Sequence, residues 1–260
     1  MKLYIFGSCS GTEPMEGRHH TSLAIEINGR VYWFDAGENC SHTAHLMGVD
    51  LLSVSDVFIS HTHMDHVGGL GNLLWNIRKL SGVKNKLPSH GDVRIYIPNL
   101  DTFHAILTVL KNTEGNYKTE YQTLVTQVSD GTLLKNDDIE VVAKHNFHLP
   151  QKGDEWQSFS FCITAKGKRI VYSGDVKSLE DLRDFLHEGC DLLLVETGHH
   201  KPEHICEEIV QKGYSVKYIY FLHHGRSVLN DFEGSQKRCE NIFPNVQFCN
   251  DGDVFDIGNL

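Results

Sequence analysis

The chain has few prolines, no long apolar run and no close pair of cysteines. It has 260 residues with 6 prolines and 7 cysteines. No apolar segment reaches the roughly 18 residues that a membrane-spanning helix needs, so no membrane partner is predicted. The cysteine count is odd and no Cys-x-x-Cys pair is present. This pattern disfavours a disulfide framework or a cysteine-ligated zinc site and favours a cytoplasmic location. The opening segment MKLYIFGSCSGTE is expected to form a first strand and not a secretory signal.

Basic residues are also scarce, because 24 Lys and Arg stand against 34 Asp and Glu, a net charge of −10. Such a surface repels polyanions unless basic residues gather locally. The clusters Arg78–Lys79, Lys84–Lys86 and Lys166–Arg169 are short, so the charge disfavours a long nucleic acid as partner.

Histidine is abundant instead, with 17 copies. A catalytic metal site uses only a handful, so the position of each histidine is more informative than the count.

The hydrophobic pattern predicts an α/β fold. Apolar residues alternate on both sides of the hairpin turn Asn28-Gly29, and they recur at helical spacing over Leu70–Leu80. The chain shows no internal repeat or linker, which favours one domain over residues 1–260 with two sheets. Strands are predicted at 2–6, 21–27, 30–34, 54–59, 93–97, 139–143, 158–164, 169–172, 191–195, 216–222 and 246–249, helices at 39–48, 70–80, 100–110, 179–187 and 202–212, and 117–128 is ambiguous.

The segment VFISHTHMDHVGGL carries the strongest chemical signal. His61 and His63 follow a buried strand at positions i and i+2, so in extended backbone they point the same way. Asp65 and His66 come next, where the chain turns into a helix whose N-terminus favours a carboxylate. Imidazole and carboxylate together suit zinc, manganese or iron. A histidine-rich loop without function is the alternative, but this order of ligands after a buried strand is specific.

These residues resemble the metallo-β-lactamase superfamily, whose hallmark motif is His-x-His-x-Asp-His. The segments GSCSGTEP, RHHTSLAIE and WFDAGEN, with their spacing to the histidine motif, are similar to the N-terminal half of ribonuclease Z and its phosphodiesterase relatives. The resemblance implies an αββα four-layer sandwich with the metals at one edge of the two sheets.

The resemblance also implies the remaining metal ligands. Asp175, in VYSGD at the end of a predicted strand, matches the aspartate that bridges two metals. The third motif offers His148, with His145 as the alternative, and the last motif offers His223, with His224 as the alternative. The implied set is His61, His63 and His148 on one metal, Asp65, His66 and His223 on the other, and Asp175 bridging them together with a hydroxide that attacks the substrate.

Three further residues receive roles from the resemblance. Asp35, at the end of VYWFD, is expected to orient a ligand histidine by hydrogen bonding, with a simple turn residue as the alternative. In LLLVETGHHKPEHICEEI, His199 is expected to act as general acid at the leaving group with Glu196 supporting it. The alternative for this segment is a helix-capping loop. Asp65 is expected to take part in catalysis as well as in metal binding.

The sequence differs from ribonuclease Z in one respect. Only 27 positions (148 to 175) separate His148 from Asp175, too few for the tRNA-binding arm of that family, and the helical insert within 82–130 is not basic overall. We therefore predict a metal-dependent phosphodiesterase acting on small or nucleotide-like esters, with two divalent ions, zinc first and manganese or iron as alternatives. A homodimer is the default expectation.

Three other functions remain as alternatives. The first is a tRNA 3′-processing endoribonuclease (ribonuclease Z), and the second is a lactonase, thioesterase or sulfatase of the same fold, because loops set the substrate. The third belongs to a different class, a non-catalytic metal-binding protein.

Overall fold

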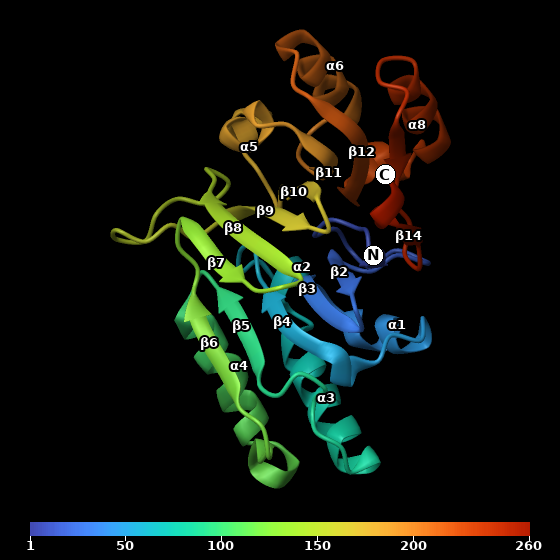
Figure 1. Cartoon of the computed structure of the whole chain (residues 1–260). Helices are drawn as coiled ribbons and strands as arrows, with labels where there is room; N and C mark the ends of the chain where they lie inside the picture. The colour runs from blue at the N-terminus through green and yellow to red at the C-terminus, as the bar shows by residue number, and fades with distance from the viewer.

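The computed structural model describes the backbone of residues 1–260 and all side chains except those of residues 114 and 115. Two seven-stranded sheets face each other, and helices cover the outer face of each one (Figure 1). One apolar cluster fills the space between the sheets, and two more lie between a sheet and its helices. The predicted α/β four-layer αββα sandwich is confirmed. That the chain forms one domain stays a prediction.

The first sheet has the order β14-β1-β2-β3-β4-β5-β6. Its strands are antiparallel as far as β3 and parallel from β3 to β6. Side chains alternate between its faces, so that Leu3 and Ile5 pack against the other sheet while Tyr4 and Phe6 pack under helices. The strands are β1 (Lys2–Gly7), β2 (Ser22–Ile27), β3 (Arg30–Ala36), β4 (Val54–Phe58), β5 (Val93–Ile97), β6 (Thr123–Gln127) and β14 (Val254–Asp256).

The second sheet has the order β13-β12-β11-β10-β9-β8-β7. Strands β10 to β13 are parallel, and β7 to β10 are antiparallel. The interior strand β11 is buried on both faces, which explains its continuous apolar run. The strands are β7 (Gly131–Lys135), β8 (Ile139–His145), β9 (Phe159–Ala165), β10 (Lys168–Tyr172), β11 (Cys190–Thr197), β12 (Val216–His224) and β13 (Val246–Phe248).

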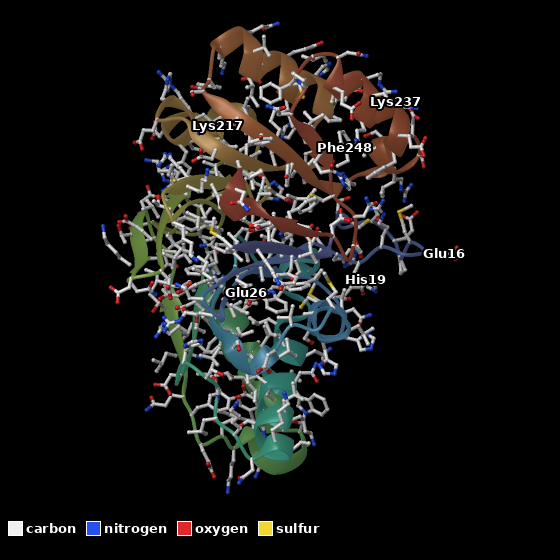
Figure 2. The ribbon with its side chains drawn as sticks, turned by 45° about the vertical axis from the view of Figure 1, so that its right-hand side comes forward. Glu16, His19, Glu26, Lys217, Lys237 and Phe248 are labelled. Carbon is white, nitrogen blue, oxygen red and sulfur yellow. The ribbon has the colours of Figure 1, made fainter. Side chains whose placement is uncertain are left out.

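Helices α1, α3 and α4 cover the first sheet, and α5, α6 and α8 cover the second (Figure 1). Helix α6 begins with Pro202 at its first turn and ends at Gly213 in the left-handed conformation. Figure 2 shows Lys217 and Lys237 at the surface, whereas Phe248 is buried beneath α8. The helices are α1 (Cys40–Leu46), α2 (Met64–Val67), α3 (Leu70–Lys84), α4 (Leu100–Lys111), α5 (Arg183–His187), α6 (Pro202–Lys212), α7 (Arg226–Leu229) and α8 (Phe232–Glu240).

The elements that the sequence failed to predict are short or lack an apolar pattern. Helix α8 buries only Ser235 and Cys239 among its own residues, so it shows no apolar stripe. Strand β7 lies at a sheet edge and is largely exposed, and α2, α7 and β14 have three or four residues each. The ambiguous segment 117–128 forms the end of a 3₁₀ turn and then β6. Among the described residues, no helix is long and apolar enough to cross a membrane.

Burial between the sheets predicts the cost of removing one core side chain. Leu194 in β11 is fully buried there, so Leu194→Ala is expected to lower the free energy of unfolding by about 2–5 kcal/mol, as measured by urea denaturation. The control is Leu46→Ala on α1, where the side chain is 72% exposed and the change is expected to stay within about 0.5 kcal/mol. Equal effects of the two variants would contradict this packing.

Candidate metal centre

The predicted ligands meet where strands from both sheets end. Asp35 lies near the carboxyl end of β3, and His61 follows β4. From the second sheet, His148 follows β8, Asp175 follows β10, and His223 lies at the end of β12. The carboxyl ends of strands are a usual place for ligand sites in α/β folds. Hydrogen bonding across the two sheets, from Phe159 N–H to the Ser60 carbonyl oxygen, holds the edges together.

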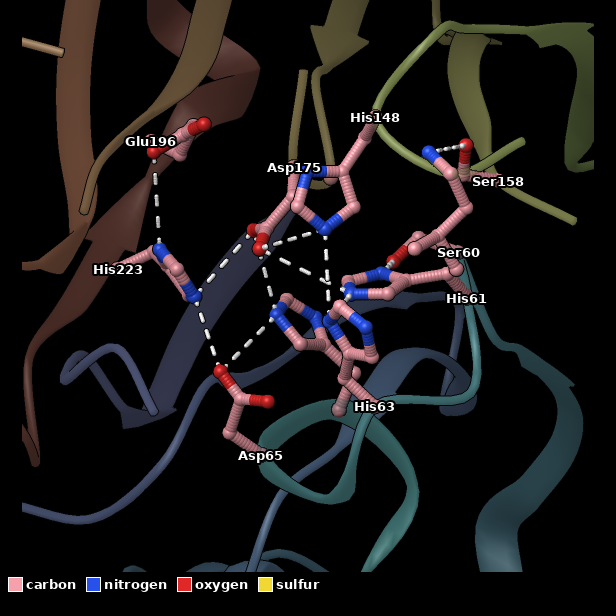
Figure 3. A network of polar contacts seen from close by, with 12 residues as sticks. Ser60, His61, His63, Asp65, His148, Ser158, Asp175, Glu196 and His223 are labelled. Carbon is pink, nitrogen blue, oxygen red and sulfur yellow. Dashed lines mark hydrogen bonds and ion pairs between the residues drawn. The ribbon is translucent and has the colours of Figure 1, made fainter. Parts of the chain in front are cut away.

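Three imidazoles form the first group of potential ligands. Nε2 of His61 lies 3.0 Å from Nδ1 of His63, and Nε2 of His148 lies 3.4 Å from that same Nδ1 (Figure 3). The Ser60 hydroxyl donates its proton to Asp35, so it accepts one from Nδ1 of His61, 3.1 Å away. That leaves the lone pair of His61 on Nε2, which faces the other two rings. Facing lone pairs repel each other unless a cation or a proton lies between them.

The second group combines a carboxylate with two imidazoles. Oδ2 of Asp65 lies 3.1 Å from Nε2 of His223 and 3.5 Å from Nε2 of His66. Asp65 and His66 lie on α2, whose short turn follows the histidine motif. Gly11 allows the loop after β1 to approach, since a Cβ there would lie 2.9 Å from the Asp65 carboxylate.

Asp175 belongs to both groups and presents one oxygen to each. Its Oδ2 lies 3.7 Å from Nε2 of His61 and 3.7 Å from Nε2 of His148. Its Oδ1 lies 3.2 Å from Nε2 of His66 and 3.3 Å from Nε2 of His223. Figure 3 shows this carboxylate between the two sets of rings. The ligand atoms of each four-residue group lie within 4.8 Å of one another, so each group is compact enough to surround one ion.

Asp35 holds the rings in place from behind. Its fully buried carboxylate accepts hydrogen bonds from the Ser60 backbone N–H (2.6 Å) and the Ser60 hydroxyl (2.7 Å). It also accepts from Nδ1 of His66 (2.7 Å) and from the Tyr172 hydroxyl (2.5 Å), which reaches it from the second sheet. Because Nδ1 of His66 is the donor, its lone pair lies on Nε2, toward Asp175. The predicted orienting role thus has matching geometry.

The structure separates the alternatives that the sequence left open. His145 lies away from the groups, where it bonds Asp130 at 2.7 Å and stacks on Trp156. His224 is buried between Thr197 and the Cys249 carbonyl oxygen, at 2.9 Å from each. His148 and His223 are therefore the histidines that join the groups.

Glu196 and His199 form a third group beside Asp175 and His223. The His199 backbone N–H donates to Oε2 of Glu196 (2.8 Å), and its Nδ1 lies 3.0 Å from Oε1. The His199 side chain is 46% exposed, whereas that of Glu196 is 1% exposed. A buried carboxylate thus fixes the orientation of an accessible imidazole at the rim of the site. The hydrogen bond that His199 donates to the Glu196 carboxylate raises the pKa of His199.

The charges in the site are strongly coupled. Burial alone would raise the pKa of Asp175, but the charges on His223 and His66 outweigh it and hold that pKa well below its usual range. Burial opposes protonation of His223, yet the Asp175 charge, the hydrogen bond that His223 donates to Asp65 and the Glu196 carboxylate 3.7 Å away raise its pKa to about 9. Burial lowers the pKa of His61, and the nearby positive charge of His66 lowers it further. The buried carboxylates thus need positive charge beside them.

These residues fit divalent ions. Nε2 of His66 and Oδ1 of Asp175 are buried, and neither has a hydrogen-bond partner among the described residues. Buried polar atoms without partners are rare, and an ion is one way to satisfy them. Imidazole and carboxylate donors match zinc, manganese or iron. The backbone at Asp35 and His223 has φ of 52° at each residue, a left-handed conformation that is costly outside glycine and tends to occur at functional sites.

A cavity of about 250 Å³ opens onto both groups. The cavity is lined by the loop 10–12, by Gly198 and His199, and by four of the ligand-type residues, His63, Asp65, Asp175 and His223. Gly198 is needed for space, because a Cβ there would lie 2.5 Å from Nδ1 of His223.

Sequence reasoning missed several residues of this site. It assigned no role to Ser60, although its place beside His61 was a signal. Tyr172 gave no local signal because its partner Asp35 lies 137 positions away. Gly11 and Gly198 matter through the space they leave, which a single sequence does not reveal.

The comparisons with known proteins agree with the fold. Residues 1–242 match the family described as "Anti-Pycsar protein Apyc1". The chain belongs to this family. It is also 26% identical over 148 residues to the ribonuclease Z of Methanothermobacter thermautotrophicus, a match that covers 57% of this chain and 45% of that protein. The chain thus spans less than half the length of that relative.

Solved structures show the same fold. The metallo-β-lactamase fold protein YhfI from Bacillus subtilis has a TM-score of 0.75 and 17% identity, with 98% of this chain and 99% of that chain covered. The short form of human tRNase Z has a TM-score of 0.69 and 19% identity, with 99% of each chain covered. The chain therefore has the metallo-β-lactamase fold, and its sequence is similar to ribonuclease Z. The predicted resemblance is confirmed.

The hydrogen bonds of Asp35 predict a loss of metal affinity in Asp35→Asn. The amide group cannot accept from all of its donors and leaves the His66 ring poorly oriented. We expect the affinity for Zn²⁺ to fall by about 10- to 100-fold, as measured by competition with a chromophoric chelator. The matched control is Asp191→Asn at the opposite end of β11, which bonds Arg169 and Lys217 and is expected to leave the affinity unchanged. Equal affinities in the two variants would rule out the role of Asp35.

Proposed function

We propose that the chain hydrolyses small, nucleotide-like phosphodiesters and that it uses two divalent ions to do so. The observation that carries this proposal is the placement of Asp175, whose two oxygens face two different groups of His and Asp side chains. A carboxylate shared in this way is the arrangement expected for a pair of ions that act together on one phosphoryl group.

His61, His63 and His148 would hold one ion, Asp65, His66 and His223 would hold the other, and Asp175 would contact both. Zinc is the first choice for these donors, with manganese or iron as alternatives. Bound there, the ions would supply Lewis acidity that activates water and neutralises negative charge on the phosphoryl oxygens.

The protein side chains would position the substrate and assist the leaving group. His199 is accessible at the rim of the cavity, and Glu196 bonds its Nδ1 at 3.0 Å, so Nε2 is free to face the substrate. A protonated imidazole in this place would donate a proton to the oxygen that departs. The loop 10–12 also lines the cavity, where it would limit the size of the group next to the phosphoryl centre.

The size of the cavity and the charge of the chain support a small substrate. A volume of about 250 Å³ is below the roughly 300–1,000 Å³ typical of drug-sized ligand pockets. The net charge of −10 opposes the binding of a long polyanion. Residues 149–174 form a loop, β9 and β10, with no further element among them. The ribonuclease Z relatives favour a phosphodiester over a lactone or a thioester.

The shared carboxylate predicts linked losses of metal and activity in Asp175→Ala. The wild-type protein is expected to contain about two metal ions per chain by elemental analysis and to cleave bis-(p-nitrophenyl) phosphate and cyclic nucleotides. In Asp175→Ala we expect turnover to fall by at least about 100-fold, because removing a direct ligand costs more than removing a residue that orients one.

The control for this test is Asp154→Ala, a substitution in an exposed loop. It is expected to leave the metal content and the turnover unchanged. Cleavage of an unprocessed tRNA alone would contradict the preference for small substrates and favour the endoribonuclease alternative. Two bound metals without any phosphodiester cleavage would contradict the proposed reaction and favour another ester or a metal-binding role.

The position of His199 predicts an effect that depends on the leaving group. In His199→Ala, kcat for cyclic nucleotides, whose leaving alkoxide needs a proton, is expected to fall by about 10²- to 10⁴-fold. For bis-(p-nitrophenyl) phosphate, which releases a stable anion, the loss is expected to be much smaller. The control is His200→Ala, because His200 bonds the Val176 carbonyl oxygen and does not line the cavity. Equal losses for both substrates would exclude a role as general acid.

The cytoplasmic location, the homodimer and the identity of the ions stay predictions.

A further inference from the structure

A second cavity lies at the far end of α3, where positive charge gathers in an otherwise acidic protein. Its volume is about 420 Å³, larger than the cavity at the candidate metal centre. Arg78, Lys79, Lys86 and Lys118 line it, against one acidic residue, Glu120. Helix α3 has fifteen residues, or about 22 Å at 1.5 Å per residue, and the histidine motif precedes its first turn. This cavity is therefore distinct from the metal centre.

Three of these cations have no acidic partner among the described side chains. Arg78, Lys86 and Lys118 form no ion pair with any residue whose side chain the structure describes. In the same part of α3, Lys84 pairs with Asp50, and elsewhere Lys212 and Arg238 each pair with two carboxylates. Positive charges that converge on one concavity without neutralisation favour an anionic ligand.

The cavity also has a fixed shape around Arg78. The Nε–H of Arg78 donates to the Lys118 carbonyl oxygen (3.2 Å), which ties the end of α3 to the segment before β6. Asn85 ends the helix in the left-handed conformation, with φ of 47°, and turns the chain so that Lys86 joins the wall. A planar guanidinium with one nitrogen held by the backbone keeps its other N–H donors for an acceptor that offers two oxygens, such as a phosphate.

Apolar side chains line the same cavity. Val83 is 82% exposed and Leu87 is 47% exposed, although both are apolar. The buried ring of Tyr121 forms part of the wall between the cations. Exposed apolar side chains beside cations suit a ligand with an organic part and a phosphate, more than inorganic phosphate alone.

We propose that this cavity binds a small organic phosphate of the nucleotide class, with Arg78, Lys86 and Lys118 holding the phosphate and Val83 and Leu87 contacting the apolar part. This site is independent of the proposed hydrolase activity and does not require metal. A long nucleic acid is less suited to it, because the positive charge is confined to one concavity on a chain of net charge −10.

Calorimetry on the full chain tests this site with AMP, a phosphomonoester without a bond for a phosphodiesterase to cleave. The titrations are run with chelator present, so that metal-dependent binding at the first cavity does not contribute. Adenosine, inorganic phosphate and a short single-stranded RNA are the comparison ligands. We expect AMP to bind, adenosine not to bind, and phosphate to bind at least tenfold more weakly than AMP. In Arg78→Ala/Lys118→Ala the AMP affinity is expected to fall at least tenfold.

The matched control is Lys152→Ala/Arg183→Ala, which removes one lysine and one arginine that pair with Asp101 and Glu180 on the surface. It is expected to keep the AMP affinity of the wild type. Lys86→Ala provides a second test, because this exposed side chain can be removed without disturbing the fold if the double variant unfolds. An AMP affinity that is the same in wild type, double variant and Lys86→Ala would overturn the proposal. Binding of the RNA without binding of AMP would also overturn it, in favour of a nucleic-acid surface.

Discussion

The carboxylate of Asp35 is the interaction on which the candidate site depends. It joins three elements that are distant in sequence, since its donors come from the end of β4, from α2 and from β10 in the opposite sheet. An unpaired buried carboxylate is costly, and the hydrogen bonds from Ser60, His66 and Tyr172 offset that cost while they connect the two sheets. The same bonds fix which nitrogen of His66 carries the proton, so the packing of the two sheets and the orientation of a ligand ring share one cause.

The electrostatics of the site follow from that packing. Burial removes water from Asp175 and Asp65 and makes each of them dependent on neighbouring positive charge. Without an ion, protonated His66 and His223 supply that charge, and the pKa of each is raised accordingly. A divalent ion would replace those protons with a stronger and better directed charge. The left-handed backbone at His223 indicates that the surrounding structure holds this ring in place against a local preference.

The sequence alone predicted those parts of the fold and of the candidate site that depend on local patterns. The histidine motif and Asp175 stand beside strands whose apolar runs are clear, and a strand that ends in a ligand-type residue can be recognised from the chain alone. The choice between His145 and His148 could not be made locally, because it depends on Asp130 and Trp156, which hold the first ring away from the site. Helix α8 escaped prediction because it buries small and polar side chains, so its position is set by tertiary packing.

The metal centre and the second cavity lie near opposite ends of helix α3, and the charges that line them differ in sign. The N-terminal end of this helix follows the histidine motif of the metal centre, and its last turns hold Arg78, with Lys86 and Lys118 lining the same cavity. Arg78 lies eight residues beyond Leu70, or about 12 Å along the helix, which is more than the Debye length of roughly 8 Å at physiological salt. The cations of the second cavity therefore neither neutralise Asp65 and Asp175 nor compete with ions bound there. The metal centre must obtain its positive charge from its own histidines and its ions, and the carboxylates of that centre do not weaken the attraction of the distant cavity for an anion.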